Sequence, residues 1–201
     1  MIHTTTVKKI LILSVAAVLI SACSTDDGRS MSPPRADQTD SVQVATTIGE
    51  VVAEDTGTMT VTGPWASGSA IDSRYTCDGE AMSPPLVWTG APEDTQAFAI
   101  VIDDMDDPAA LTWLVTNIDF AITNTKEGEA PAGAVVGKNS NGTAEYLAPC
   151  PPRGSTHTYV VTVYALDGLT PLEDGADAAT MRADIESAAL EAATTVFTVS
   201  R

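Results

Sequence analysis

From about residue 58 onward, hydrophobic and polar positions alternate over short stretches, a pattern typical of β-strands. Five stretches have the length and the alternating or β-branched composition of strands. They are Met59–Thr62, Ala97–Asp103, Thr112–Ile118, His157–Leu166 and Thr195–Ser200. Glycine and proline separate them, as Gly63-Pro64 does after the first, and Asn141-Gly142 predicts a tight turn.

One late stretch has helical spacing instead. Within Thr180–Ala193, apolar residues recur three or four positions apart, and this predicts a helix. They are Met181, Ile185, Ala188, Ala189 and Ala192. Many short strands with a single late helix indicate an all-β fold, a two-sheet and mostly antiparallel β-sandwich with a C-terminal helix.

The first residues have the features of a bacterial export signal. Two lysines precede the apolar run Ile10–Ile20, which is too short to span a bilayer. The run closes on Ile20-Ser21-Ala22-Cys23, which resembles a lipobox, the motif whose cysteine is lipidated and becomes the new N-terminus. We therefore expect a lipoprotein signal peptide over residues 1–22 and lipidation of Cys23, with palmitate among its acyl chains. The alternative is an ordinary signal peptide cut near Ala22.

Residues 23–57 have the composition of a flexible tether. Serine, threonine, aspartate and a proline pair dominate them, and the first aromatic residue of the chain is Trp65. So polar a segment buries too little apolar surface to offset the entropy of ordering. We expect the folded domain to span residues 58–201.

The charge balance limits the partners of the chain. Ten basic residues face 27 acidic ones, which gives a net charge of −17, or −19 once the two lysines of the leader are removed. Nucleic acid is excluded as a partner because its phosphates need a basic surface. An anionic membrane repels such a domain, so the lipid must hold the protein in the cell envelope.

The remaining cysteines, Cys77 and Cys150, form an even pair in an exported chain. Both lie in loops rich in proline or glycine. We expect a disulfide between them, and the alternative is two buried free thiols.

Acidic residues gather at the end of the apolar stretch that begins at Ala97. The two-residue period of a strand places Asp104 on the same face as the apolar residues before it, and it places His157 and Tyr159 on the core face of another strand. An aspartate beside a histidine keeps the imidazole cationic, which suits an anionic ligand such as phosphate. The other interpretation is a core histidine bonded to Asp104 with nothing bound.

Metal and cofactor chemistry is not expected. Pro108 and Leu114 stand where a calcium loop of the EF-hand type needs glycine and glutamate. After removal of the leader, His157 is the only histidine, so a zinc site would depend on carboxylates. The sequence also lacks a nucleophile elbow, a P-loop and a dinucleotide fingerprint.

Several motifs occur in the order found in a known family. They are Tyr75-Thr-Cys-Asp-Gly79, Ser83-Pro-Pro-Leu-Val-Trp88, Asp103-Asp-Met-Asp-Asp-Pro108, Trp113-Leu-Val-Thr-Asn-Ile118, Ala148-Pro-Cys-Pro-Pro152 and His157-Thr-Tyr159. Together they resemble the phosphatidylethanolamine-binding protein family, and most of all its bacterial branch described as Raf-kinase-inhibitor-like. The resemblance covers about Thr58 to Arg201.

The resemblance implies a Greek-key sandwich with a small anion-binding pocket near one end. It implies that Asp104 and Asp106 are pocket carboxylates and that Pro108 ends the same motif. Two residues depart from the family pattern, since Thr112 stands where the family has a pocket histidine and Thr158 where it has an arginine. Each replacement removes a group able to donate a charge-assisted hydrogen bond, worth about 1.5–3 kcal/mol.

We expect a membrane-anchored binding protein for a small anionic, phosphate-type ligand, with no turnover. The expected ligand-binding residues are Asp104, Asp106, Pro108, Thr112, His157 and Tyr159. In this interpretation His157 and Tyr159 donate to the ligand, Asp104 orients His157, and Asp106 fixes the loop at the mouth. The first alternative is a protein-interaction or inhibitor module with an envelope partner and a vestigial pocket. The second is a hydrolase that uses His157 and Asp104 as its acid–base pair.

Overall fold

The computed structural model describes residues 58–201. The predicted signal peptide (residues 1–22), the predicted tether (residues 23–57) and Cys23 lie outside the described residues.

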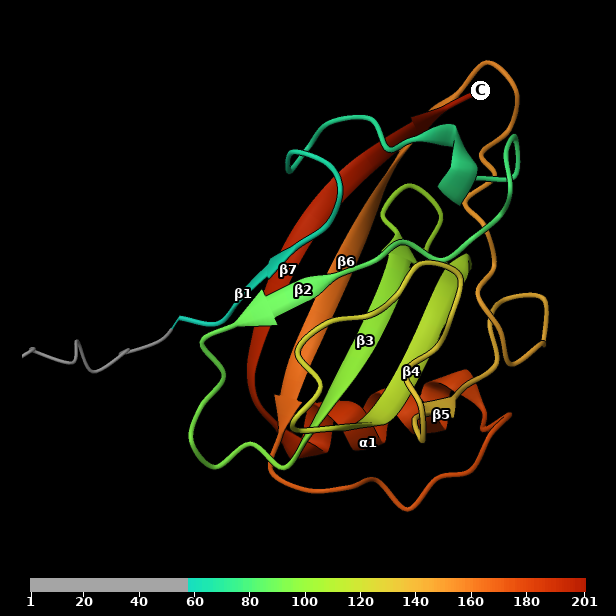
Figure 1. Ribbon diagram of the computed structural model, residues 1–201. Coiled ribbons are helices and arrows are strands. Elements are labelled where there is room, and N and C mark those ends of the chain that lie inside the picture. Colours follow the sequence, from blue (N-terminus) through green and yellow to red (C-terminus); the bar gives the residue numbers. More distant parts are fainter. Residues whose placement is uncertain (1–57) are drawn as a thin grey trace, which may run out of the picture. The chain divides into compact units, whose positions relative to one another are not determined.

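Two antiparallel sheets and one helix make up the described domain (Figure 1). The small sheet pairs β1 (Thr60–Thr62) with β2 (Val87–Thr89). The five-stranded sheet has the order β5-β4-β3-β6-β7. Its strands are β3 (Ala97–Asp104), β4 (Leu111–Asp119), β5 (Val135–Val136), β6 (Thr156–Leu166) and β7 (Ala189–Ser200). The predicted fold class, all-β with two antiparallel sheets and a C-terminal helix, is therefore confirmed.

The large sheet is buried on both faces. One face packs with Trp88 of β2 and with loop residues, and the other packs with Met181 and Ile185 of the helix α1 (Ala178–Ala188). Figure 1 shows β2 and α1 on opposite sides of this sheet. Because β3 is central, its apolar run is buried on both faces, with Phe98 toward the small sheet and Val101 toward α1.

The boundary between the helix and the last strand differs from the prediction. The helix ends at Ala188, and Ala189, predicted as helical, is already extended and begins β7. The alanine-rich sequence is compatible with either structure, and pairing along the whole of β6, from Leu166↔Ala189 to Thr156↔Ser200, decides it. No helix in the described part of the chain is both long and apolar enough to cross a membrane.

The other differences concern short strands. The strands β2 and β5, which have three and two residues, were not predicted from the sequence. Elements this short carry no readable alternation, and pairing with neighbouring segments defines them, β1 and Asn124 for β2 and β4 for β5. A short 3₁₀ turn at Ser73–Tyr75 also lies in the stretch expected to be loop.

Candidate functional site

A cavity of about 340 Å³ lies where β3 ends and β6 begins. Strand pairing sets Asp104 directly opposite Tyr159 there. Four of the six predicted ligand residues line this cavity, namely Asp104, Thr112, His157 and Tyr159. The period of the strands therefore brings together the residues that the sequence placed on one face.

Asp104 and His157 form the central contact of the cavity. The ring Nδ1–H of His157 donates to Oδ2 of Asp104 at 2.7 Å. The side chain of Asp104 is 4% exposed and that of His157 is 16% exposed, so the imidazole is the more accessible partner. Since Nδ1 is occupied, Nε2 is the ring nitrogen left to a ligand.

Two backbone N–H groups complete the environment of Asp104. Oδ1 accepts from Asp106 N at 2.9 Å and from Asp107 N at 3.2 Å, so the aspartate shapes the loop that follows it. Burial opposes ionisation, but the hydrogen bonds from His157 and from the backbone of Asp106 outweigh it, and the pKa of Asp104 is lowered. Asp104 is therefore a carboxylate with both oxygens engaged.

The hydrogen bond to Asp104 raises the pKa of His157 above its ordinary value. Burial works against this rise and is the second-largest effect, while the charges of Asp104, Asp106 and Asp107 add smaller contributions that raise the pKa. The imidazole therefore holds its positive charge to a higher pH than a free histidine does. It offers a cationic donor to the cavity.

Tyr159 supplies a second donor. Burial raises the pKa of its phenol, and the interaction with Asp104 raises it further, so the hydroxyl keeps its proton. The ring stacks on Phe197 with 5.2 Å between centroids, and Phe197 meets Trp65 edge to face at 5.1 Å. This packing fixes the position of the phenol.

Asp106 and Pro108 do not line the cavity. Asp106 was predicted to fix the loop at the mouth, and its Oδ2 accepts a hydrogen bond from the backbone N of Thr158 at 2.7 Å. Asp103, next to the pocket aspartate, points to the opposite face and pairs with Arg182 of α1 at 2.6 Å. The neighbouring aspartates thus bind different partners.

Within residues 58–201, no group of three or more His, Cys, Asp or Glu side chains is placed to hold a metal ion.

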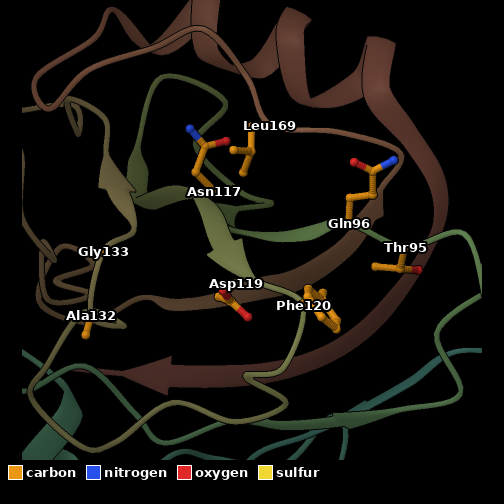
Figure 2. Close-up of a pocket in the computed structure, with 8 residues that line it drawn as sticks. All are labelled: Thr95, Gln96, Asn117, Asp119, Phe120, Ala132, Gly133 and Leu169. Carbon is orange, nitrogen blue, oxygen red and sulfur yellow. The ribbon is translucent and has the colours of Figure 1, made fainter. Parts of the chain in front are cut away.

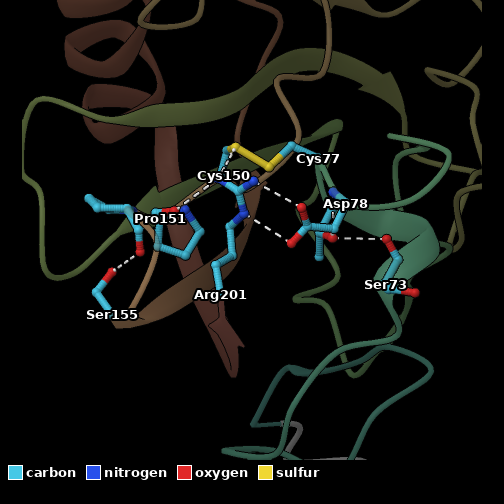
Figure 3. The surroundings of a disulfide bond; sticks show 9 residues. Ser73, Cys77, Asp78, Cys150, Pro151, Ser155 and Arg201 are labelled. Atoms are coloured by element: carbon cyan, nitrogen blue, oxygen red, sulfur yellow. Dashed lines mark hydrogen bonds and ion pairs between the residues drawn. A yellow bond between two sulfur atoms is a disulfide. The ribbon is translucent and has the colours of Figure 1, made fainter.

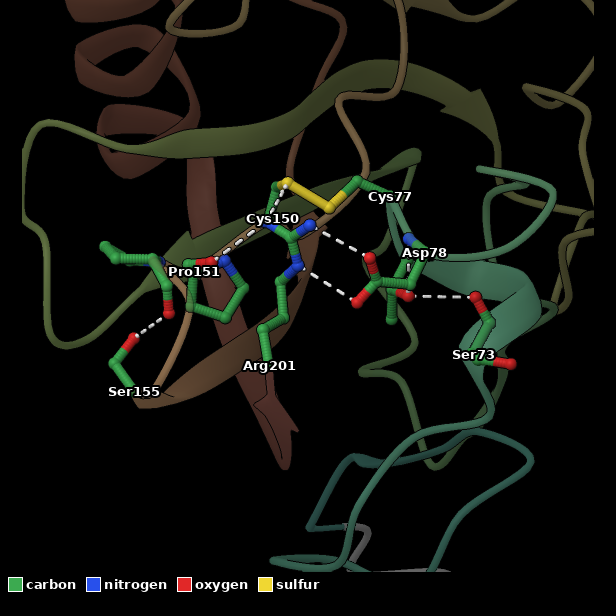
Figure 4. Close-up of polar contacts among 9 residues, drawn as sticks. Ser73, Cys77, Asp78, Cys150, Pro151, Ser155 and Arg201 are labelled. Atoms are coloured by element: carbon green, nitrogen blue, oxygen red, sulfur yellow. Dashed lines mark hydrogen bonds and ion pairs between the residues drawn. A yellow bond between two sulfur atoms is a disulfide. The ribbon is translucent and has the colours of Figure 1, made fainter.

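One wall of the cavity comes from residues 147–152, in and beside the Ala-Pro-Cys-Pro-Pro motif. A disulfide of 2.03 Å joins Cys150 of this wall to Cys77, with 5.3 Å between the Cα atoms (Figure 3). Figure 4 shows Arg201 across the same junction, donating to Asp78 and to the carbonyl oxygen of Pro151. The motif spacing pointed to Cys150, but nothing in the sequence placed Arg201 here.

Sequence reasoning also missed Asp107, Ser140 and Asn141, which line the cavity. Asp107 was visible as part of the acidic cluster, but the strand period ends at Asp104 and assigns no face beyond it. Ser140 and Asn141 belong to the predicted tight turn, where the Gly142 N–H donates to the carbonyl oxygen of Asn139 at 2.8 Å. Their position depends on tertiary contacts of that loop.

A larger cavity of about 700 Å³ lies at the other end of β3 and β4 (Figure 2). Its lining includes the exposed side chains of Phe120 and Leu169, and Asp119 is its only ionisable group. It contains no paired acid and base. The smaller cavity is therefore the better candidate for specific ligand recognition, in spite of its size.

Comparison with known proteins gives a consistent set of relatives. The sequence model of the family described as phosphatidylethanolamine-binding protein matches residues 62–200. A UPF0098 protein of Methanothermobacter thermautotrophicus is 44% identical over 113 residues, which cover 53% of this chain and 74% of that protein. A UPF0098 protein of Mycobacterium tuberculosis is 33% identical over 189 residues, covering 91% of this chain and 89% of the relative.

A protein of Mycobacterium tuberculosis named as lipoprotein LppC is 37% identical over 122 residues, covering 59% of this chain and 60% of LppC. Among solved structures, Escherichia coli YbcL, described as a member of the mammalian PEBP family, superposes with a TM-score of 0.67 at 26% identity. The superposition covers 71% of this chain and 98% of YbcL. A PEBP homologue of Chlamydia trachomatis gives a TM-score of 0.66 at 27% identity, covering 71% and 97%.

Proposed function

This chain belongs to the phosphatidylethanolamine-binding protein family, and from that membership we propose that the cavity at Asp104 and His157 binds a small phosphorylated ligand without turning it over. The family is named for binding rather than for a reaction, which favours a binding protein. The proposal concerns the ligand class.

The observation that carries the proposal is the accessible imidazole of His157, held cationic by a buried carboxylate. A phosphate oxygen at Nε2 would accept a charge-assisted hydrogen bond, and the protonated phenol of Tyr159 lies in the same cavity. Both groups favour an anion over a neutral ligand.

The carboxylates of the lining refine the ligand class. Both oxygens of Asp104 are engaged, whereas Asp107 uses Oδ1 for the backbone N of Ala109 and leaves Oδ2 without a partner among the described residues. A bare polyanion would be repelled by these two acids. A ligand with an ammonium group near its phosphate, such as a zwitterionic headgroup, would satisfy His157 and Asp107 together.

The test is calorimetric titration with two probes, inorganic phosphate and phosphoethanolamine. We expect phosphoethanolamine to bind more tightly than phosphate and His157→Ala to abolish binding of both. Thr158→Ala is the matched control, because Thr158 adjoins His157 but does not line the cavity. If neither probe binds to the wild-type protein at millimolar concentration, the proposal is rejected. Release of phosphate from phosphoethanolamine that is lost in His157→Ala would overturn the absence of turnover.

A second candidate function is a protein-interaction module. Neutral Thr112 lines the cavity where the family has a histidine, and Met105, at the edge of the loop, is 61% exposed. An exposed methionine is an adaptable apolar contact. Crosslinking in envelope extract would test this function. A single crosslinked partner that is lost in Met105→Glu, together with no phosphate binding in the wild type, would favour the interaction module over the binding protein.

The proposal includes a lipid anchor at Cys23. The lipobox pattern supports it, as does the similarity to LppC. Replacement Cys23→Ala is expected to move the protein from the membrane fraction to the soluble fraction, whereas Thr158→Ala stays with the membrane. Continued membrane association of Cys23→Ala would reject the anchor.

A further inference from the structure

We propose that the Cys77–Cys150 disulfide is a thiol–disulfide exchange site, and that its reduction by a dithiol partner loosens the wall of the cavity and weakens ligand binding. The binding half of this inference rests on the proposed function.

The position of the bond links it directly to the cavity. Cys150 lines the cavity together with Pro149, Pro151 and Pro152, and the disulfide ties this wall to the loop that follows Tyr75 (Figures 3 and 4). His157 and Tyr159 also line the cavity, and they belong to the paired strand β6. Reduction therefore removes the covalent link that holds residues 147–152, whereas His157 and Tyr159 stay in the sheet.

Few other contacts hold the wall to that loop. The Cys77 N–H donates to the carbonyl oxygen of Pro149 at 3.2 Å. Arg201 donates to both carboxylate oxygens of Asp78 at 2.9 Å and to the carbonyl oxygen of Pro151 at 3.2 Å. These bonds cross the same junction as the disulfide, and the two between Arg201 and Asp78 are exposed. They would keep the wall near its place after reduction without fixing it.

The surroundings of the sulfur atoms favour exchange. Cys150 is exposed and Cys77 is half-buried, so a reductant has access to the bond. Nη1 of Arg201 lies 3.1 Å from the Cys150 Sγ. A cation at this distance stabilises a thiolate and so makes Cys150 the better leaving group.

The exchange follows from this asymmetry. A thiolate of the dithiol attacks the Cys77 sulfur, the Cys77–Cys150 bond breaks, and Cys150 leaves as a thiolate beside Arg201. The second thiol of the partner then attacks the mixed disulfide and releases Cys77. The partner leaves as a disulfide, and two electrons have passed to the two cysteine sulfurs. Of the two protons that the dithiol loses, one goes to Cys77 and one to solvent, while Cys150 remains a thiolate.

The closing experiment measures binding in both redox states. The full chain with Cys23→Ser, purified in detergent, is titrated with phosphoethanolamine before and after reduction with dithiothreitol, and circular dichroism monitors the fold. We expect the reduced protein to stay folded and to bind about tenfold more weakly, the factor that corresponds to ordering roughly one residue of backbone on binding. Cys77→Ser/Cys150→Ser should reproduce the weaker affinity.

The outcomes separate the two proposals. Equal affinity in both redox states overturns the exchange proposal and leaves the proposed function standing, and unfolding on reduction also overturns it. Absence of binding to the oxidised protein overturns both.

A second measurement tests Arg201 itself through the rate of reduction by dithiothreitol. We expect Arg201→Gln to slow it and the matched control Arg153→Gln to leave it unchanged, while equal rates in both variants would overturn the role of Arg201.

Discussion

The hydrogen bond between His157 and Asp104 makes the stability of the domain depend on pH. Asp104, with its lowered pKa, contributes stability that is present above the unfolded pKa near 4 and is lost as pH falls through the folded pKa. His157, with its raised pKa, contributes stability that is present below the unfolded pKa near 6.5 and is lost as pH rises through the folded pKa. The pair therefore stabilises most between about pH 4 and 6.5.

His157 is the single histidine of residues 58–201 and gives a direct test of this pairing. In a proton NMR titration, the pKa of His157 is expected to lie above 6.5 in the wild-type protein and to fall in Asp104→Asn, because the neutral amide no longer favours the cation. Thr158→Ala should leave it unchanged. An equal pKa in wild type and Asp104→Asn would contradict the assigned cause.

Removal of the Asp104 carboxylate is expected to cost more stability than removal of a neighbouring one. Asp104→Ala leaves Nδ1–H of His157 and the backbone N–H groups of Asp106 and Asp107 without an acceptor. The free energy of unfolding is therefore expected to fall by about 2–3 kcal/mol. Asp107→Ala removes one exposed hydrogen bond and should cost less than about 1 kcal/mol. Urea unfolding at pH 5.5 compares the two variants, and equal losses would contradict the central role of Asp104.

At the residue scale, the sequence was informative as far as the strand period extends. It placed Asp104, His157 and Tyr159 on one face, and the structure brings these three into one cavity. Beyond the strand ends the period gives no direction. Asp106 and Pro108, both predicted to bind the ligand, follow the strand end and do not line the cavity. The contribution of Arg201 could not be predicted because it depends on chain segments 51 and 123 residues away.

At the scale of elements, the contact between α1 and the sheet depends on Met181. Its side chain is fully buried, and Gly137 lies so near that a Cβ there would be 2.7 Å from the methionine sulfur. Met181→Ala is expected to lower the free energy of unfolding by about 2–5 kcal/mol through lost burial and a cavity. Met105→Ala, at an exposed methionine, should change it by less than about 0.5 kcal/mol. Similar losses for the two variants would contradict this packing.

The elements differ in how much the sequence could reveal. Long strands with a buried face, β3, β4 and β6, were predicted within a residue or two. The helix start was predicted two residues late, at Thr180, although Asp177 caps the helix by accepting from Ala179 N and Thr180 N. Its end was missed because alanine suits both structures and only pairing with β6 selects the strand.

For the molecule as a whole, the net charge of −17 sets the response to salt. Like charges repel one another more in the compact state than in the unfolded chain, and salt screens that repulsion over about 10 Å at 0.1 M. The melting temperature is therefore expected to rise between 10 mM and 200 mM sodium chloride. A falling melting temperature would show that the ion pairs, such as Arg182–Asp103, outweigh the general repulsion.

The last strand has a consequence for when the domain can fold. β7 pairs with β6 along its whole length, Met59 N donates to Glu191 of β7 at 2.7 Å, and the backbone of Ser69 accepts from Thr198 N at 2.9 Å. Segments from the beginning and from the end of the domain thus form hydrogen bonds with each other. These distant contacts cannot close until β7 has been synthesised, so we expect the domain to complete its fold late. Such a delay suits the export proposed from the leader sequence, since a chain that folds late can still be threaded through a translocation channel.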